Sequence, residues 1–348
     1  MKYLMIGAGA IGTYLGGSLL SAGKDVAFLE KPEYADSLIQ NGVTIHIGDQ
    51  VIHHAPVTVF SDVKNAFQEE VDVVIFVIKS FDTEDAARDL APYGDRIKRI
   101  LCLQNGVENE IVLEKTFGKD KVIGGSVTSS IGRIAAGNVR LEKLRGIGIE
   151  NRDGLAEDIV RDFNDAGLNA IAYPHRLDLK WSKMLSNLLL NASCAILDMT
   201  PLEVIKSREV FHLELRQFKE AVRVMRKLGI KPTNIPRVPI KTLSLVIHVL
   251  PDILLQKVLF KPLGGGRGAK MPSLHIDFHQ GKTQSEVIFL NGAVSRIGKS
   301  VGVPTPVSDA YMEVLSHLVI HPEQMAEYAH NVKALVSAVR EKEKTYGG

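Results

Sequence analysis

Three polar side chains recur at every fourth position in a stretch of the sequence that is otherwise apolar. Lys183, Asn187 and Asn191 would form one row along one face of a continuous helix. The residues around them are large and apolar, namely Trp181, Met184, Leu185, Leu188, Leu189 and Leu190. A lysine buried there needs an anionic partner, a ligand or a solvent-filled cleft, because an unpaired buried charge is costly. The row therefore indicates a ligand site; the alternative is a lysine that reaches the surface while the asparagines bond to nearby backbone.

A glycine motif near the N-terminus has the form that binds the pyrophosphate of a dinucleotide. The motif is Gly7-Ala8-Gly9-Ala10-Ile11-Gly12. It follows a short apolar run and opens an amphipathic stretch that ends near Gly23, which is the context of a strand, a tight turn and a helix. Gly7 permits the tight turn, Gly9 allows close approach of the pyrophosphate, and Gly12 lets the helix pack on the sheet. The amides at the start of the helix then face the phosphates.

The residues at the end of the next expected strand bear on the choice of dinucleotide. Glu30 lies where an acidic side chain accepts a hydrogen bond from the ribose 2′-hydroxyl of NAD. Lys31, directly after it, could instead neutralise the 2′-phosphate of NADP. Glu30 would repel a phosphate unless it turned away, so the two residues argue in opposite directions. The sequence favours NADP (NADPH) over NAD only narrowly.

Two further polar residues follow the ends of expected strands. Lys79 comes after the β-branched run 71–78, and Asn105 comes after the run 100–103. Open α/β sheets bind ligands at the carboxyl ends of their strands, so both residues are candidates for contact with a bound dinucleotide. The alternatives are a solvated strand end at Lys79 and a simple turn at Asn105-Gly106.

Strand and helix alternate along the first half of the chain. Strands are expected at 2–6, 25–30, 71–78 and 100–103, and helices at 10–22 and 83–90. This alternation predicts right-handed crossovers and an α/β fold with a Rossmann-type doubly wound sheet. Helical patterns dominate after Tyr173-Pro174. We therefore expect a dinucleotide-binding domain over residues 1–172 and an all-helical substrate domain over residues 173–348.

The composition is that of an ordinary globular protein. The 348 residues are 45% hydrophobic and 24% charged, and the net charge of +2 gives no strong attraction to nucleic acid or acidic membranes. No apolar run reaches the roughly 18 residues of a membrane span. Cys102 and Cys194 lie among apolar neighbours, as free thiols would in the cytoplasm. The apolar stretch 243–260 indicates a buried or interface helix pair, and residues 263–268 indicate a flexible connection.

The order and spacing of several motifs resemble those of the ketopantoate reductase family over nearly the whole chain. Besides the glycine motif, they are Ile78-Lys79, Leu103-Gln104-Asn105-Gly106, Trp181-Ser182-Lys183-Met184-Leu185-Ser186-Asn187 with Asn191, Pro272-Ser273, Asp277, Glu286 and Leu290-Asn291-Gly292. The resemblance implies an NAD(P)H-dependent 2-dehydropantoate 2-reductase of pantothenate biosynthesis. Such an enzyme reduces the C2 ketone of ketopantoate to pantoate by hydride transfer from the cofactor.

The resemblance also implies a role for each matching residue. Lys183 would be the general acid, and Glu286 would complete the catalytic site. The expected cofactor contacts are Gly7, Ala8, Gly9, Ala10, Ile11, Gly12, Glu30, Lys31, Lys79 and Asn105. The expected substrate contacts are Asn105, Asn187, Asn191 and Ser273. Thr283-Gln284-Ser285-Glu286 also fits a capping box, in which Glu286 would only reach back to the amide of Thr283.

The sequence departs from the family pattern in places that concern the substrate. The stretch 232–271 is longer and more apolar, and it could reshape the pocket, form a lid or build a homodimer interface. Asp198 adds a negative charge where an amide is more usual. Two alternatives to ketopantoate reduction therefore stay open: a reductase or dehydrogenase of a different small 2-oxo acid, and a non-catalytic NADP(H)-binding sensor.

No metal site is expected from the sequence. The histidines considered, His175, His248, His275 and His279, show no triad or metal-ligand spacing and are assigned to the surface or the core. His53 and His54 are adjacent in an expected strand, so their side chains should point to opposite faces of it.

Overall fold

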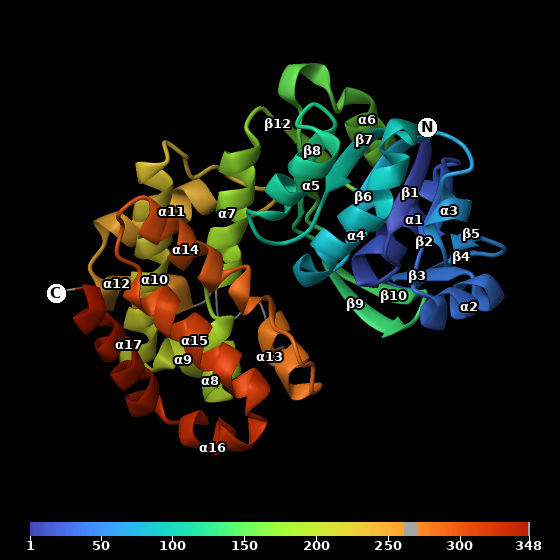
Figure 1. The fold of residues 1–348 in the computed structure, drawn as a ribbon. Helices are drawn as coiled ribbons and strands as arrows, with labels where there is room; N and C mark the ends of the chain where they lie inside the picture. Colours follow the sequence, from blue (N-terminus) through green and yellow to red (C-terminus); the bar gives the residue numbers. More distant parts are fainter. Residues whose placement is uncertain (261–270, 347–348) are drawn as a thin grey trace. The chain divides into compact units, whose positions relative to one another are not determined.

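The computed structural model describes residues 1–260 and 271–346, and the chain divides into two compact units (Figure 1). The first unit comprises Met1–Lys180 and Ile235–Val238, and the second comprises Trp181–Asn234 and Pro239–Gly348. The boundary between the units falls inside helix α7 (Arg176–Leu188), a few residues after the division at 172 that the sequence analysis expects. The expected flexible connection at 263–268 lies outside the described residues.

The first unit is built on an eight-stranded sheet with the order β12-β11-β8-β7-β6-β1-β2-β5. These strands are β1 (Lys2–Ile6), β2 (Asp25–Leu29), β5 (Thr58–Phe60), β6 (Val71–Phe76), β7 (Ile97–Cys102), β8 (Val122–Val127), β11 (Ile147–Glu150) and β12 (Ala170–Tyr173). All neighbours from β5 to β8 pair in parallel, and the strand order runs outward from β1 in both directions. In this sheet only β8 and β11 pair antiparallel. The predicted Rossmann-type doubly wound sheet is confirmed.

Helices cover this sheet because successive side chains of its central strands point to opposite faces and both sets are apolar. The helices of the first unit are α1 (Ala10–Ser21), α2 (Pro32–Asn41), α3 (Val63–Ala66), α4 (Thr83–Leu90), α5 (Asn109–Phe117) and α6 (Glu157–Asp165). Tyr3 and Met5 of β1 belong to a core that includes Leu15 of α1. Leu4 of β1 belongs to a second core with Leu90 of α4. The helix predicted at 83–90 is confirmed.

A second, four-stranded sheet in this unit was not anticipated from the sequence. Its strands are β3 (Val43–Ile47), β4 (Gln50–His54), β9 (Ser130–Ala135) and β10 (Asn138–Lys143), in the order β4-β3-β10-β9. It packs against α1, where Gly17 leaves room for Ile45: a Cβ at Gly17 would lie 2.8 Å from the Ile45 side chain. In β4 the ring of His53 hydrogen-bonds to Thr44 and that of His54 to Ser21, so the two histidines do not form a pair.

The second unit is helical within the part that the structure describes. Its helices after α7 are α8 (Ala192–Leu197), α9 (Pro201–Lys206), α10 (Arg208–Lys227), α11 (Ile240–Val249), α12 (Asp252–Leu259), α13 (Ser273–His279), α14 (Asn291–Ser300), α15 (Pro306–Ile320), α16 (Met325–Tyr328) and α17 (Val332–Tyr346). The 20-residue helix α10 contacts α9, α11, α12, α14, α15 and α17. It therefore forms the centre of this unit (Figure 1).

The predicted helix pair at 243–260 exists as α11 and α12, and one of its faces is exposed rather than buried. The exposed apolar side chains of this face are Leu245, Val249, Ile253, Leu254, Val258 and Phe260. Leu245 and Val249 are more than 60% exposed, at 64% and 68%. Large apolar side chains gathered on one surface are typical of an interaction site.

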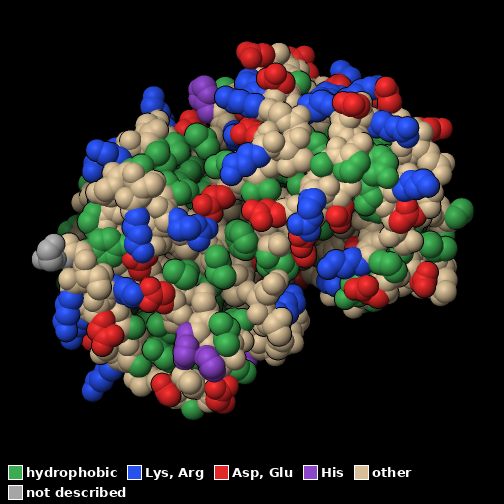
Figure 2. Space-filling view, viewed as in Figure 1, with side chains coloured by type: hydrophobic (Ala, Val, Ile, Leu, Met, Phe, Trp, Pro, Cys, Tyr) green, Lys and Arg blue, Asp and Glu red, His purple; other side chains and the backbone are tan. Residues whose placement is uncertain are grey.

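On the face seen in Figure 2, basic and acidic side chains are interspersed over both units. Within residues 1–260 and 271–346, no helix is long and apolar enough to cross a lipid bilayer. Cys102 and Cys194 are both buried free thiols, as predicted.

Gly12 and Gly9 offer a direct test of the strand–turn–helix packing. A Cβ at Gly12 would lie 2.0 Å from the carbonyl oxygen of Gly7, whereas a Cβ at Gly9 would have no heavy atom within 4 Å. We expect Gly12→Ala to lower the stability of the first unit by about 1–3 kcal/mol, because rigid backbone has to move. Thermal unfolding followed by circular dichroism measures the effect.

Gly9→Ala is the matched control, since Gly9 has a φ of −66° that alanine also adopts. Its thermal midpoint should stay close to that of the parent chain. Equal midpoints for Gly12→Ala and Gly9→Ala would contradict this account of the packing.

Candidate functional site

The glycine motif forms the turn between β1 and α1 and leaves backbone amides accessible. Gly7 has a φ of +96°, a conformation that favours glycine. Gly9 is the N-cap residue of α1 and offers no side chain to the first amides of the helix. No side chain caps this helix start, so its amides can bind an anion. The space above Gly9 is open, as close approach of a pyrophosphate requires.

Glu30 lies directly beside this turn. Its Oε2 accepts a hydrogen bond from the amide of Ala8 at 2.6 Å, and its Oε1 accepts one from the amide of Lys31 at 2.8 Å. The carboxylate therefore faces the glycine motif and does not turn away from it. The ammonium of Lys31 is largely exposed and lies 3.8 Å from a carboxylate oxygen of Asp82.

The loops that carry Lys79 and Asn105 follow β6 and β7, which are neighbours in the sheet. Both loops therefore emerge at the sheet edge that also carries the glycine turn after β1. The backbone carbonyl of Asn105 accepts hydrogen bonds from Ser80 Oγ at 3.1 Å and from Asn109 Nδ2 at 2.7 Å. Gln104 Nε2 donates to the carbonyl of Ile78 at 3.0 Å. These bonds tie the two loops together, and they leave the side chain of Asn105 exposed.

A buried ion pair beneath these loops was missed in the sequence analysis. Lys180 Nζ lies 2.8 Å from Glu110 Oε1, and each side chain is only 2% exposed. The same ammonium donates to the carbonyl of Gln104 at 2.6 Å. One turn earlier in α7, Arg176 pairs with Glu114 at 2.5 Å. The spacing of Arg176 and Lys180, i and i+4 at the start of an apolar helix, is the signal that could have revealed this face.

The predicted row of three polar residues on one helix is wrong for its third member. Helix α7 ends at Leu188, and Leu190 has a φ of +56°, so the chain turns before α8 begins at Ala192. Lys183 and Asn187 remain one turn apart on α7, and both are half-buried. The predicted apolar surroundings of Lys183 are confirmed, since Trp181, Met184 and Leu185 are buried.

Asn191 uses its amide to hold the backbone around this break. Its Oδ1 accepts a hydrogen bond from the amide of Leu274 at 3.1 Å, and its Nδ2 donates to the carbonyl of Asn187 at 3.0 Å. This is the backbone-bonding alternative that the sequence analysis left open for the asparagines. The bond to Leu274 also brings the start of α13, and with it the exposed Ser273, next to Asn191.

Glu214 of α10 fixes the same break from the other side. Its Oε2 accepts a hydrogen bond from the amide of Leu190 at 2.5 Å, and Gln217 Nε2 donates to the carbonyl of Leu188 at 3.0 Å. Glu214 is fully buried, and this burial raises the pKa of its carboxyl group to about 7. The sequence offered no signal for this role, because a glutamate in a long helix is usually exposed.

Glu286 is a buried residue at the start of a short 3₁₀ turn, Glu286–Ile288, with 5% of its surface exposed. The side chain that caps this turn is that of Ser285, which accepts from the amide of Val287. The capping box with Thr283 is therefore wrong, since the helical turn begins at Glu286, two residues later than that motif requires. Asp277 of α13 pairs with Lys282.

His275 and His279, which the sequence analysis assigned to the surface or the core, both approach the carboxylate of Asp198. Asp198 Oδ1 lies 2.7 Å from His275 Nε2 and 3.4 Å from His279 Nε2. The hydrogen bond from His275 lowers the pKa of the Asp198 carboxyl group, and burial lowers the pKa of His275. The extra negative charge at Asp198 thus has partners of its own within the second unit.

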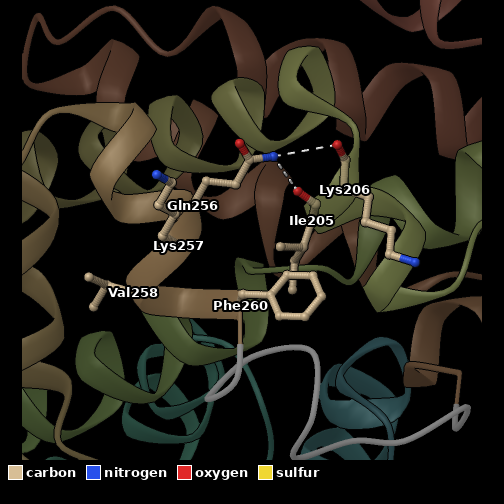
Figure 3. A pocket seen from close by; sticks show the side chains of 6 residues that line it. All are labelled: Ile205, Lys206, Gln256, Lys257, Val258 and Phe260. Carbon is tan, nitrogen blue, oxygen red and sulfur yellow. Dashed lines mark hydrogen bonds between the residues drawn. The ribbon is translucent and has the colours of Figure 1, made fainter.

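One hollow on the surface of the second unit is lined by described residues that are not among the predicted site residues. It has a volume of about 510 Å³ and lies between the end of α9 and helix α12 (Figure 3). The described residues that line it are Ile205, Lys206, Gln256, Lys257, Val258 and Phe260. Gln256 Nε2 donates across it to the carbonyl of Ile205 at 2.7 Å. The hollow therefore belongs to the apolar face of α11 and α12.

Two sequence models of one family match this chain. The model for ketopantoate reductase PanE/ApbA matches residues 3–154, and the model for the ketopantoate reductase PanE/ApbA C-terminal domain matches residues 177–319. Together they cover most of the chain. They span both the dinucleotide-binding fold and the helical unit.

Named relatives and solved structures agree with this match. The chain is 24% identical to a 2-dehydropantoate 2-reductase of Lactococcus lactis, over 93% of this chain and 99% of the relative. It is 26% identical to one of Pyrococcus horikoshii, over 88% and 94%. A PanE/ApbA family ketopantoate reductase from Ralstonia eutropha has a similar fold, with a TM-score of 0.77, 24% identity and coverage of 93% and 100%. A D-mandelate dehydrogenase solved with NADH and anilino(oxo)acetate has a TM-score of 0.76, 22% identity and coverage of 92% and 99%.

Glu214 generates a prediction about pH and stability. Its carboxyl pKa is about 7 in the folded chain against an ordinary value of 4.5. Between these pH values the folded chain therefore keeps a proton on Glu214 that the unfolded chain has lost. The free energy of unfolding that this proton contributes is fully present below about pH 4.5, and it is lost as the pH rises through about 7. The shift corresponds to at most about 3 kcal/mol. Glu214→Gln removes this titration and keeps an acceptor for the Leu190 amide.

The thermal midpoint of Glu214→Gln should therefore rise relative to that of the parent chain between pH 5 and pH 8. Glu209→Gln, at an exposed position of the same helix, serves as the control and should show no such trend. A difference between Glu214→Gln and parent that does not vary with pH would exclude the titration of Glu214.

Proposed function

The chain belongs to the ketopantoate reductase PanE/ApbA family, and from this membership we propose that it reduces 2-dehydropantoate to pantoate with a nicotinamide cofactor. Members of the family are nicotinamide-dependent oxidoreductases, and the chain is accordingly an enzyme of that class. The reaction converts a C2 ketone into a 2-hydroxy acid.

The first unit has the features that a dinucleotide needs. The open space above Gly9 and the uncapped amides of α1 fit a pyrophosphate, and the Glu30 carboxylate beside Ala8 fits a ribose hydroxyl. The amides from Ala10 and Ile11 would contact the phosphates. Lys79 and Asn105, at the carboxyl ends of β6 and β7, would contact the nicotinamide half.

Lys183 is the proposed general acid. A bound nicotinamide in its reduced form supplies the hydride that reduces the ketone carbon. As the carbon–oxygen double bond opens, negative charge grows on the carbonyl oxygen, and the Lys183 ammonium stabilises it and then donates a proton to it. The neutral amine regains its proton from solvent. A half-buried lysine suits this role, because it reaches the solvent for reprotonation and still acts in partly desolvated surroundings.

The remaining predicted residues are proposed to position the substrate. Asn187, one turn from Lys183, would bind a hydroxyl or carboxylate of the oxo acid, and the exposed Ser273 would add a second hydrogen bond. Asn191 would act mainly by holding the backbone of Asn187 and Leu274 in place, since its side-chain amide makes hydrogen bonds to both. Glu286 would bind a substrate hydroxyl or orient Lys183. Asn105 would contact both cofactor and substrate.

One observation supports this assignment most strongly. Lys183 and Asn187 are polar residues of helix α7. The apolar side chains beside them, Trp181, Met184 and Leu185, are almost completely buried. A helix placed in a core for stability alone has no need of a lysine and an amide on successive turns of the same face. The pair is therefore best explained by a ligand.

The orientation of Glu30 leads us to propose NADH as the preferred cofactor. From the sequence alone, Lys31 narrowly favoured NADPH, on the assumption that Glu30 could turn away. The bond between Glu30 Oε2 and the Ala8 amide holds the carboxylate at the turn, where it would accept from a ribose 2′-hydroxyl and repel a 2′-phosphate. Lys31 would still contribute to the binding of NADPH.

We further propose that the enzyme forms a homodimer through the apolar face of α11 and α12. This face carries the six exposed apolar side chains named above, and an interface buries such groups in its centre. Sedimentation measurements on the chain and on Leu245→Glu test the idea, since a charge at the centre of the contact should give monomers. A monomeric parent chain would disprove it.

A different small 2-oxo acid is the second candidate substrate. The chain shares its fold with a D-mandelate dehydrogenase that was solved with anilino(oxo)acetate. Rates with ketopantoate and with a panel of aromatic and aliphatic 2-oxo acids separate the two candidates. A chain that binds the cofactor and reduces none of them would instead support the non-catalytic sensor.

Replacing Lys183 tests the proposed general acid. Lys183→Ala should lower the turnover of ketopantoate by between about a hundredfold and ten-thousandfold. Affinity for the cofactor, measured by fluorescence titration, should barely change. Lys206→Ala, at an exposed position of the same unit, serves as the control. Undiminished turnover in Lys183→Ala would remove this lysine from the mechanism.

Replacing Glu30 and Lys31 tests the cofactor assignment. The parent chain should use NADH with a higher kcat/KM than NADPH. Glu30→Gln should shift this ratio toward NADPH on the order of tenfold, because a loss of about 1.4 kcal/mol of repulsion changes a ratio tenfold. Lys31→Ala should weaken the binding of NADPH far more than the binding of NADH. A parent chain that prefers NADPH, with a ratio unchanged in Glu30→Gln, would refute the assignment.

A further inference from the structure

Two histidines and one aspartate meet on the surface of the second unit, where no role has been assigned to them. His275 and His279 lie one turn apart on α13, and their rings stack with centroids 4.0 Å apart. Asp198 follows α8 with a φ of +50°. That left-handed turn redirects the chain at the end of α8, and the Asp198 carboxylate meets both rings.

The three side chains present their ligand atoms to one point. Asp198 Oδ1 is 2.7 Å from His275 Nε2 and 3.4 Å from His279 Nε2, and one ligand atom from each of the three side chains can be chosen so that all lie within 4.8 Å of one another. Zinc binds imidazole nitrogen and carboxylate oxygen at about 2.0–2.2 Å in a tetrahedral arrangement. Ligand atoms in such a site are roughly 3.3 Å apart. The observed separations lie on either side of this value, so small side-chain rotations would complete the geometry.

The chemistry and accessibility of the group also suit a metal ion. Two imidazoles and a carboxylate form a donor set of intermediate softness, which favours Zn²⁺ and its neighbours over Mg²⁺ or Ca²⁺. The exposed fractions of the His275, His279 and Asp198 side chains are 12%, 39% and 41%, so an ion can enter from solvent and keep a water as fourth ligand. A hydrogen bond between Asp198 and His275 alone would not require the second ring to approach the same oxygen atom.

We propose that Asp198, His275 and His279 form a binding site for one divalent transition-metal ion of the zinc type. The ion would join the end of α8 to α13. Both elements also meet at the hydrogen bond between Asn191 Oδ1 and the Leu274 amide. Metal binding would therefore stabilise the region that carries Ser273 without taking part in the reduction.

A second histidine pair in the chain provides a matched control. His317 and His321 also lie one turn apart, with ring centroids 4.7 Å apart. However, His317 bonds to Gln324 and His321 to Glu323, so the two rings do not converge on one carboxylate oxygen. If helical spacing alone bound the ion, this pair would bind it as well.

The test is a calorimetric titration of the full chain, freed of metal by a chelator, with Zn²⁺ alone. We expect one tight site per chain in the parent and in His317→Ala. His279→Ala should weaken binding by at least about tenfold. Asp198→Asn, which keeps the hydrogen bond to His275, should weaken it similarly and confirm that the loss is not due to misfolding. A parent chain that binds no Zn²⁺ would overturn the proposal. So would equal affinity for Zn²⁺ in the parent, His279→Ala and Asp198→Asn, or a loss of tight binding in His317→Ala.

Discussion

A lysine with 2% of its side chain exposed is stable only if its charge is paired, and this constraint ties helix α7 to the first unit. Lys180 meets it through Glu110 and the carbonyl of Gln104. The start of α7 is thereby tied to the loop that ends in Asn105. Because a helix rises 1.5 Å per residue, Lys183 follows roughly 4.5 Å farther along the same axis. The buried pair thus anchors the helix that also carries the proposed catalytic lysine.

Buried polar groups also organise the helical unit. Glu214 and Gln217 of α10 bond to the backbone where α7 ends. Farther along α10, Glu220 accepts hydrogen bonds from the amides of Val307 and Ser308 at the start of α15. Each satisfies backbone groups that a helix end leaves without partners. The long central helix therefore specifies where its neighbours begin and end.

The features predicted well from the sequence are those set by local rules. The glycine turn follows from the positive φ that Gly7 adopts and from the close packing that Gly12 allows. The parallel strands follow from β-branched runs such as 71–76. The break at Leu190 could not be predicted from local rules, because the carboxylate that holds the Leu190 amide belongs to Glu214, 24 residues farther along the chain. The contact between Asp198 and the two histidines of α13 was missed for the same reason: long-range contacts decide it.

The central claim is that the ammonium of Lys183 protonates the carbonyl oxygen of a 2-oxo acid. A crystal structure of the chain with a nicotinamide cofactor and a non-reacting analogue of ketopantoate tests it most directly. The account predicts that Lys183 Nζ lies within about 2.6–3.2 Å of the oxygen that replaces the ketone, or is joined to it through one water. A bound analogue whose oxygen is held by other donors, with Lys183 directed into solvent, would contradict it.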